Sequence, residues 1–141
     1  MMIKKFSTLL FLTLFSSSTL QAEESRMLVE MPSMMQNHMM ANMRDHMAAL
    51  DEMLRALSTD QLDKVADIAE QRLGMSSLDN HGASHMAQVM PAPMRTIGTQ
   101  MHRAASQLAR VASEGDRVAA YDQLHQVTRN CVACHTQYRI R

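Results

Sequence analysis

Apolar residues recur at steps of three and four in three long stretches of the chain, and this spacing constrains its fold more than any other feature. Such steps place apolar side chains on one face of an α-helix, the face that packs against neighbouring helices. The first helix is expected to begin near Ser33, and its spaced residues are Met40, Met43, Met47, Leu50, Leu54 and Leu57. In the two later stretches they are Met94, Ile97, Met101, Ala104, Leu108 and Val111, then Tyr121, Leu124, Thr128, Cys131, His135 and Tyr138.

A shorter helix is predicted over residues 62–73, where Gly74 ends it, and Asp116 is placed to cap the last helix. Residues 75–93 include glycine and proline and are expected to form mostly loop. Helices of this kind with mostly short connections predict an all-α fold, an antiparallel up-down four-helix bundle. We expect the bundle to span residues 23–141.

Residues 1–22 have the order of a secretory signal peptide. Lys4 and Lys5 precede an apolar run over residues 6–15, and small polar residues then lead to Ala22, after which cleavage is expected. The run is shorter than the about 20 residues that a transmembrane helix needs. The sequence therefore predicts a periplasmic protein that is not inserted in a membrane once the signal is removed.

The composition of the predicted mature chain indicates a core that is not built on aromatic side chains. All three phenylalanines leave with the signal peptide and the chain has no tryptophan, so Tyr121 and Tyr138 are the large rings that remain. Fourteen of the sixteen methionines stay. Small domains have little core to spare, and flexible methionines suit packing around an irregular apolar body. A large flat cofactor would fit such an interior.

Residues 131–135, Cys-Val-Ala-Cys-His, match the C-x-x-C-H signature of haem attachment. Each thiol, Cys131 and Cys134, adds across one vinyl group of the same haem, so both sulfurs must reach one ring. His135 then supplies the proximal nitrogen to the iron. On a helix, Cys131 and His135 are four residues apart and share a face. The motif predicts one covalently bound haem c.

Three other uses of the motif fit less well. A disulfide between Cys131 and Cys134 suits an oxidising compartment, but it leaves His135 and the aromatic-poor core without a role. A thioredoxin-like redox pair needs a strand before the motif, whereas here a helix precedes it. Structural zinc takes four ligands, and the chain has two cysteines.

The segment Cys131 to Arg139, Cys-Val-Ala-Cys-His-Thr-Gln-Tyr-Arg, lies at the C-terminal end of a predicted four-helix chain with a signal peptide. In this it resembles the class II cytochromes c, the cytochrome c′ family. The resemblance implies a left-handed four-helix bundle with haem lodged among the helices near one end. It also implies that Arg139 lies near the haem edge or a propionate, with a solvated cation at a helix C-terminus as the alternative.

The resemblance further implies that the distal iron ligand, in members that have one, is a methionine of the first helix. In an up-down bundle the end of the fourth helix lies beside the start of the first, so a haem at His135 meets the N-terminal half of that helix. Met43 lies on the apolar face about three turns into the helix and is the expected ligand, with Met39 and Met40 as alternatives. Methionines at such spacing are also ordinary core residues.

Whether a protein ligand occupies the sixth coordination position of the iron decides between two functions. With methionine bound, the iron is six-coordinate and low-spin, which suits a one-electron carrier working with redox partner proteins. With an empty distal side, the protein resembles a five-coordinate cytochrome c′ that binds nitric oxide or carbon monoxide. No nucleophile–base pair or carboxylate dyad indicates an enzyme.

A periplasmic copper-binding protein is the alternative from a different class. Thioether ligands favour Cu(I), and a loose His/Met run is formed by His81, His85, Met86, Met90 and Met94. Two further histidines, His38 and His46, stand among the methionines of the first helix, but they lie off its apolar face and are expected at the surface.

The charge balance of the mature chain points to no particular class of macromolecular partner. Without the two lysines of the signal peptide, twelve basic residues face fourteen acidic ones. No basic run indicates binding to nucleic acid. Homodimers are common in the resembling family, so a homodimer is included among the expected partners.

Overall fold

The computed structural model describes residues 24–141, and the predicted signal peptide of residues 1–22 lies outside them. The helices are α1 (Ser33–Ser58), α2 (Leu62–Ile68), α3 (Ala83–Met86), α4 (Ala92–Ser113) and α5 (Arg117–His135). A π-helical turn, Ala69–Leu73, extends α2, and a 3-10 turn covers Met75–Ser77. Two short strands, β1 (Met27–Leu28) and β2 (Tyr138–Arg139), complete the described part of the chain. The prediction of a helical chain is confirmed, although neither the strands nor α3 was predicted.

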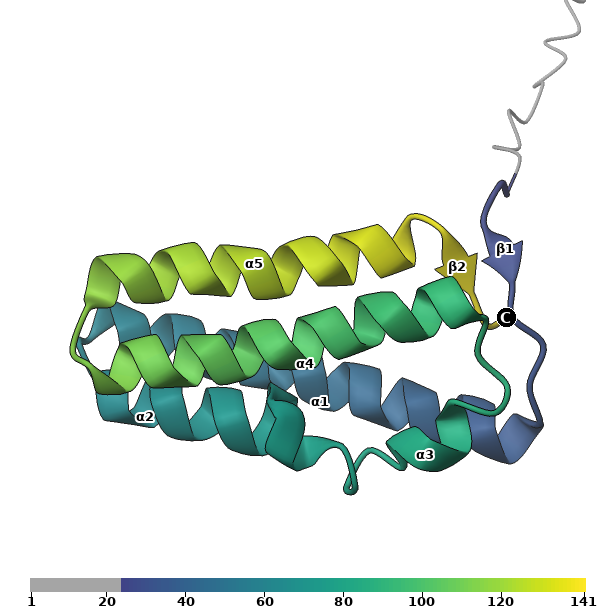
Figure 1. Ribbon diagram of the computed structural model, residues 1–141, viewed down its shortest axis with the longest axis horizontal. Coiled ribbons are helices and arrows are strands. Elements are labelled where there is room, and N and C mark those ends of the chain that lie inside the picture. Colours follow the sequence, from purple (N-terminus) through teal and green to yellow (C-terminus); the bar gives the residue numbers. More distant parts are fainter. Residues whose placement is uncertain (1–23) are drawn as a thin grey trace, which may run out of the picture.

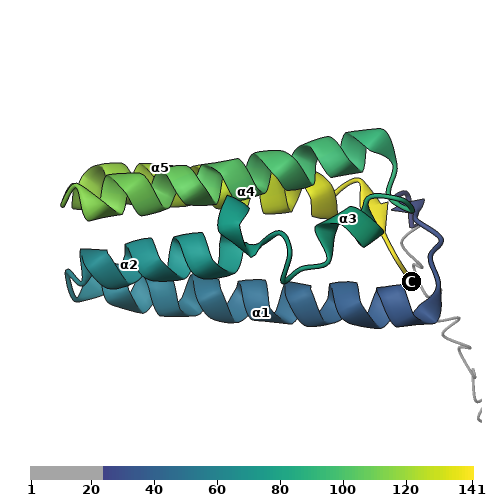
Figure 2. The same cartoon turned by 60° about the horizontal axis from the view of Figure 1, so that its bottom comes forward.

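The long helices form two layers (Figures 1 and 2). In Figure 2, α1 and α2 lie in one layer and α4 and α5 in the other, and α3 lies between α1 and α4 at one end. Contacts join α1 to α2, α2 to α4, and α4 to α5. The strands lie at the same end as α3 (Figure 1), which we call the strand end. None of the helices in residues 24–141 is long and apolar enough to cross a membrane.

The helix boundaries have local causes. Pro32 has a φ of −54° and its carbonyl oxygen accepts the first helical hydrogen bond from the Gln36 N–H, so α1 begins at Ser33 as predicted. The Asp116 side chain accepts a 2.9 Å hydrogen bond from the Ala119 N–H, which confirms the predicted cap of α5. Gly115 precedes it with a φ of +82°, a conformation that glycine adopts without strain.

The inward face of helix α1 matches only part of the face that the apolar spacing predicted: Leu57 is buried and Leu50 packs against the core as expected. Met47 is 67% exposed and Leu54 is 51% exposed, although both belong to the predicted face. The buried residues of this helix are His46, Ala49, Met53, Ala56 and Leu57. The prediction is wrong at Met47 and Leu54 because the rest of the inward face carries a histidine and two alanines, which hydropathy patterns weigh little.

The predicted faces of α4 and α5 agree better with the structure. In α4, Met94, Met101, Leu108 and Val111 are buried as expected. In α5 the buried residues are Ala120, Leu124 and Val127, and Cys131 packs against the same core. Tyr121 is 44% exposed, so its predicted place in the core is wrong.

The interior divides into two apolar clusters. The larger one joins α1, α2, α4 and α5 around Met53, Leu57, Leu73 and Leu108, all with no exposed surface. The smaller one lies at the strand end and consists of Val29, Met31, Met86, Met94 and Tyr138. Methionines therefore supply much of the smaller cluster, and Tyr138 is its one large ring.

Strands β1 and β2 pair in parallel and join the two ends of the described chain. Met27 lies opposite Tyr138, and Leu28 lies opposite Arg139. Backbone hydrogen bonds of 2.8 Å from the Met27 N–H to the Gln137 carbonyl and from the Val29 N–H to the Arg139 carbonyl fix the register. This pairing holds the residues that directly follow the C-x-x-C-H motif.

The difference between the predicted and the observed face of α1 can be tested by two methionine substitutions. Met53 has no exposed surface, so Met53→Ala is expected to lower the free energy of unfolding by about 2–5 kcal/mol. Met47→Ala removes an exposed side chain and is expected to change it by less than about 0.5 kcal/mol. Urea denaturation of both variants measures this, and the reverse order would contradict the observed face.

Candidate functional site

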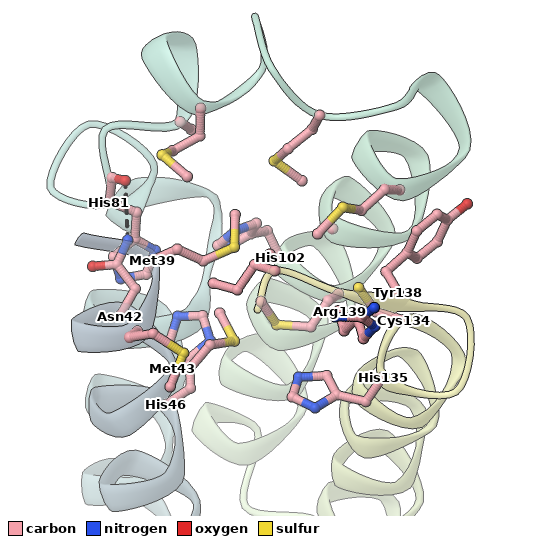
Figure 3. A pocket seen from close by; sticks show the side chains of 18 of the residues that line it. Met39, Asn42, Met43, His46, His81, His102, Cys134, His135, Tyr138 and Arg139 are labelled. Atoms are coloured by element: carbon pink, nitrogen blue, oxygen red, sulfur yellow. Dashed lines mark hydrogen bonds between the residues drawn. The ribbon is translucent and has the colours of Figure 1, made fainter. Parts of the chain in front are cut away.

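A cavity of about 330 Å³ lies at the strand end, between the N-terminal half of α1 and the C-terminal end of α5. Figure 3 shows side chains from both helices directed toward this common space. Further walls come from α3, from α4 and from the segment after α5. The lining is mostly thioether and aliphatic, with imidazoles and arginines at particular places.

The structure brings most of the predicted haem-attachment motif to this cavity. Cys134 and His135 line it, and the His135 ring extends from α5 toward α1 in Figure 3. Cys131 lies one turn earlier, does not line the cavity, and packs half-buried against the larger core. Burial raises the pKa of both thiols, and the charge of Cys131 adds to the effect on the pKa of Cys134.

All three methionines considered for the distal position line the same cavity. Met39, Met40 and Met43 are half-buried on α1. In Figure 3, Met39 and Met43 lie on the wall opposite His135. Further thioethers complete the apolar lining, namely those of Met86, Met90, Met94 and Met101. The methionine excess of the sequence is thus concentrated around this cavity.

Two features of the cavity wall are suited to a ligand: one is a hydrogen-bond donor without an acceptor, and the other is open space. The Nε atom of Arg139 is buried and has no hydrogen-bond partner among residues 24–141. Gly98 of α4 lines the cavity, and a Cβ built there would meet no atom within 4 Å. A buried N–H without an acceptor is costly, so Arg139 is suited to an anionic group entering the cavity.

Three histidines meet in the cavity wall, and sequence reasoning did not bring them together. His46 of α1, His81 of the loop before α3 and His102 of α4 all line the cavity. Their ring centroids are 4.8 Å apart for His46 and His81, 5.5 Å for His81 and His102, and 6.2 Å for His46 and His102. We call these three residues the histidine cluster. The expectation that His46 lies at the surface is wrong, because it is 7% exposed.

Only some of the other residues of the predicted His/Met run lie at the cavity. Met86, Met90 and Met94 line the cavity, whereas His85 is exposed and does not line it. Although His81 and His85 are close in sequence, the structure places His81 with His46 and His102 instead. Sequence spacing held no signal for this, because the cluster joins three separate elements.

Hydrogen bonds hold the histidine cluster in place. The His81 carbonyl accepts from Nε2 of His38 at 2.9 Å and from Nδ2 of Asn42 at 3.1 Å, which fastens the loop to α1. Figure 3 shows the bond from Asn42. Nδ1 of His102 donates to the Leu73 carbonyl at 2.7 Å. Nε2 of His46 is buried without a partner among residues 24–141.

Electrostatics keep the cluster neutral. Burial, followed by the neighbouring imidazoles His81 and His102, lowers the pKa of His46 from 6.5 to about 4. Burial is also the largest cause that lowers the pKa of His81 and of His102. A neutral imidazole keeps a free lone pair, so these rings are available as hydrogen-bond acceptors or metal ligands near pH 7.

An ion pair network lies beside the cluster and joins α1 to the π-helical turn. Arg72 contacts Asp45 at 2.6 Å and Glu52 at 2.8 Å, and it also donates to the Asp45 carbonyl at 3.1 Å. The hydrogen bonds from Arg72 lower the pKa of the Asp45 carboxyl. Arg72 thus has its charge matched by two carboxylates of α1.

A protein-family model described as Cytochrome C′ matches residues 32–139, so the chain belongs to the cytochrome c′ family. This confirms the resemblance seen in the C-terminal motif. The family implies a covalently bound haem c and a role as an electron carrier or a gas-binding protein. Searches of curated proteins and of solved structures gave no match.

The residues at the cavity fit a haem c. Cys134 and His135 of the attachment motif face a methionine-lined space, the position of a Gly98 Cβ is open, and the Arg139 N–H lacks an acceptor that a carboxylate would provide. Soft thioether and imidazole donors are ligands that haem iron takes in proteins. The donor set and the polar contacts of the wall thus agree with the cofactor that the family implies.

Acid is expected to destabilise the protein through the buried histidines. Because the pKa of His46 is about 4 in the folded protein and near 6.5 when unfolded, the unfolded state binds more protons between these values. The stabilisation is present above pH 6.5 and is lost as the pH falls toward 4, by about 3 kcal/mol for this group. Urea denaturation with a chelator present, at pH values from 7.5 to 4, measures the loss.

The variants His46→Leu and His85→Leu test whether the loss of stability at low pH comes from His46. His46→Leu removes a proton-binding difference and is expected to flatten the pH dependence, whereas His85→Leu replaces an exposed ring and leaves it unchanged. An equal slope in wild type and His46→Leu would contradict the assignment.

Proposed function

We propose that this chain is a periplasmic one-electron carrier with one haem c, exported by a signal peptide over residues 1–22. Residues 23–141 form an antiparallel up-down four-helix bundle in this proposal. The haem is attached through Cys131 and Cys134, His135 is the proximal ligand and Met43 the distal ligand. Its partners are redox proteins, and it is not an enzyme.

One observation carries the proposal: His135 and Met43 line one cavity from opposite helices, α5 and α1. A ligand pair of this kind must approach one plane from two sides, and a motif residue and a methionine on facing walls are suited to it. Membership of the cytochrome c′ family supports the covalently bound haem c, and the family includes both electron carriers and gas-binding proteins.

The bound haem would supply reversible one-electron chemistry at its iron, and the chain tunes that chemistry. A thioether ligand such as Met43 raises the reduction potential and occupies the position where a gas would bind. Met86, Met94 and Met101 are buried and give the cavity apolar walls. A low-polarity surrounding disfavours the more highly charged oxidised state, which acts in the same direction as the methionine ligand.

Met43→Ala tests the distal ligand in the haem-loaded protein. Wild type is expected to show the weak charge-transfer band of an iron–thioether bond when oxidised and to form no ready carbon monoxide adduct when reduced. Met43→Ala is expected to lose the band and to bind about one carbon monoxide per haem, because the sixth position opens. Absorption spectroscopy of both proteins measures this.

Met39→Ala and Met40→Ala are the matched controls, since both side chains line the same cavity. Neither is expected to change the band. A spectrum that changes in one of these variants but not in Met43→Ala would move the ligand to that residue. Rapid carbon monoxide binding by wild type would overturn the carrier and favour the five-coordinate, gas-binding alternative.

Arg139→Gln tests the proposed contact with the haem edge. Loss of a nearby cation stabilises the more positive, oxidised haem, so the reduction potential should fall. One charge at about 10 Å in an effective dielectric of 20 to 40 is worth about 1 kcal/mol, or roughly 40 mV for one electron. Redox titration measures it, with Arg129→Gln as control because Arg129 is exposed on α5. Equal shifts in both variants would refute a specific contact.

A further inference from the structure

The rings of the histidine cluster lie close to the separations of a three-imidazole metal site. Its ring centroids are 4.8, 5.5 and 6.2 Å apart. An ion bound at 2.0–2.1 Å to one nitrogen of each of three imidazoles, in tetrahedral geometry, places the ring centroids about 5 Å apart. Three elements that are distant in sequence thus bring three rings to nearly the separation that one shared ion requires.

The rings also present free nitrogens. Nδ1 of His102 donates to the Leu73 carbonyl, which leaves its Nε2 lone pair free. Nδ1 of His81 lies 3.4 Å from Oγ of Ser77, whose own proton is donated to the Gly74 carbonyl, so this ring is also oriented through Nδ1. Metal-binding histidines typically have the second ring nitrogen held by such a protein group.

His46 supplies a second indication of a ligand at this wall of the cavity. Its Nε2 is buried and has no partner among residues 24–141, in a side chain that is 7% exposed overall. A buried polar atom without a partner costs free energy that a bound ligand recovers. Burial also lowers its pKa, so the ring is neutral and able to bind a cation near pH 7.

We propose that His46, His81 and His102 bind one divalent transition-metal ion of the zinc and copper(II) class. In the structure as it stands, no three histidine, cysteine or carboxylate side chains of residues 24–141 are placed to hold an ion. The ion therefore draws the rings together by small rotations of their side chains. Water or another small ligand takes the remaining coordination position.

The surrounding charge allows a cation. Asp45 is close enough to raise the pKa of His46 and His81, which is the sign of a favourable field for positive charge. Arg72 opposes it, but Arg72 is held by Asp45 and Glu52, whose two negative charges outweigh its one. A donor set of three imidazoles suits zinc and copper(II), whereas Cu(I) favours thioethers and thiolates.

This proposal differs from the predicted His81–His85 copper run, because His85 is exposed and lies outside the cavity. It does not rest on the proposed electron-carrier function either. Its three ligands lie in the wall of the cavity assigned to the haem, but none of them is a residue of the haem motif. The haem-loaded protein can be tested whichever state its iron has.

Calorimetric titration of the haem-loaded protein with Zn²⁺ tests the site. Wild type is expected to bind one ion per chain. His46→Gln, His81→Gln and His102→Asn should each weaken that binding at least about tenfold, since each removes one ligand. The asparagine in His102→Asn keeps a donor near the Leu73 carbonyl. His85→Gln is the matched control, because it alters a neighbouring exposed histidine and is expected to leave the affinity unchanged.

Two further measurements keep the outcome interpretable. The helical circular dichroism and haem absorption of each variant show whether it has folded, and zinc-edge X-ray absorption of wild type should show imidazole nitrogens around the ion. Absence of one-to-one binding in wild type would overturn the proposal. So would binding that survives the three cluster variants or is lost in His85→Gln, since the ion would then lie on the surface.

Discussion

Helix α1 packs closely against its neighbours over only part of its length. The cavity exists because the N-terminal half of this helix is not packed in the same way. From Ala49 to Leu57 its buried residues belong to the larger core. In the N-terminal half of α1, by contrast, three methionines are half-buried and face the cavity, namely Met39, Met40 and Met43. The ion pairs from Arg72 to Asp45 and Glu52 hold α1 to the π-helical turn near the boundary. A well-packed half thus supports a half that is left open for a ligand.

Much of the helical content could be predicted because its causes are local. The Asp116 cap and the spaced apolar residues of α4 act within a few residues of the chain. The inward face of α1 could not be predicted in the same way. Ala49 and Ala56 are buried because they are small enough for neighbouring helices to approach, and this depends on partners that the pattern of one helix does not contain.

The candidate site likewise has one part that the sequence predicts and one part that it does not. His135 and Cys134 come from one short motif, so their place at the end of α5 follows from the sequence. The histidine cluster depends on three separate elements of the chain. His85, the histidine nearest to His81 in sequence, is not part of it. Here hydrogen bonds from His38 and Asn42 to the His81 carbonyl position the loop. Such long-range contacts leave no periodic signal in the sequence.

The paired strands explain why Arg139 is a stronger indicator of a ligand than its sequence position alone suggested. A residue after a helix end is ordinarily free to turn its cation into water, but β1 fixes the backbone at Arg139 by pairing it with Leu28. Its Nε is buried without an acceptor, although Glu24 is close enough for its carboxyl pKa to be lowered by the charge of Arg139. Holding a cation in this way costs free energy unless an anion approaches from the cavity. In the proposed haem protein a propionate would do so, and the strand pair would then hold in place the residue that binds it.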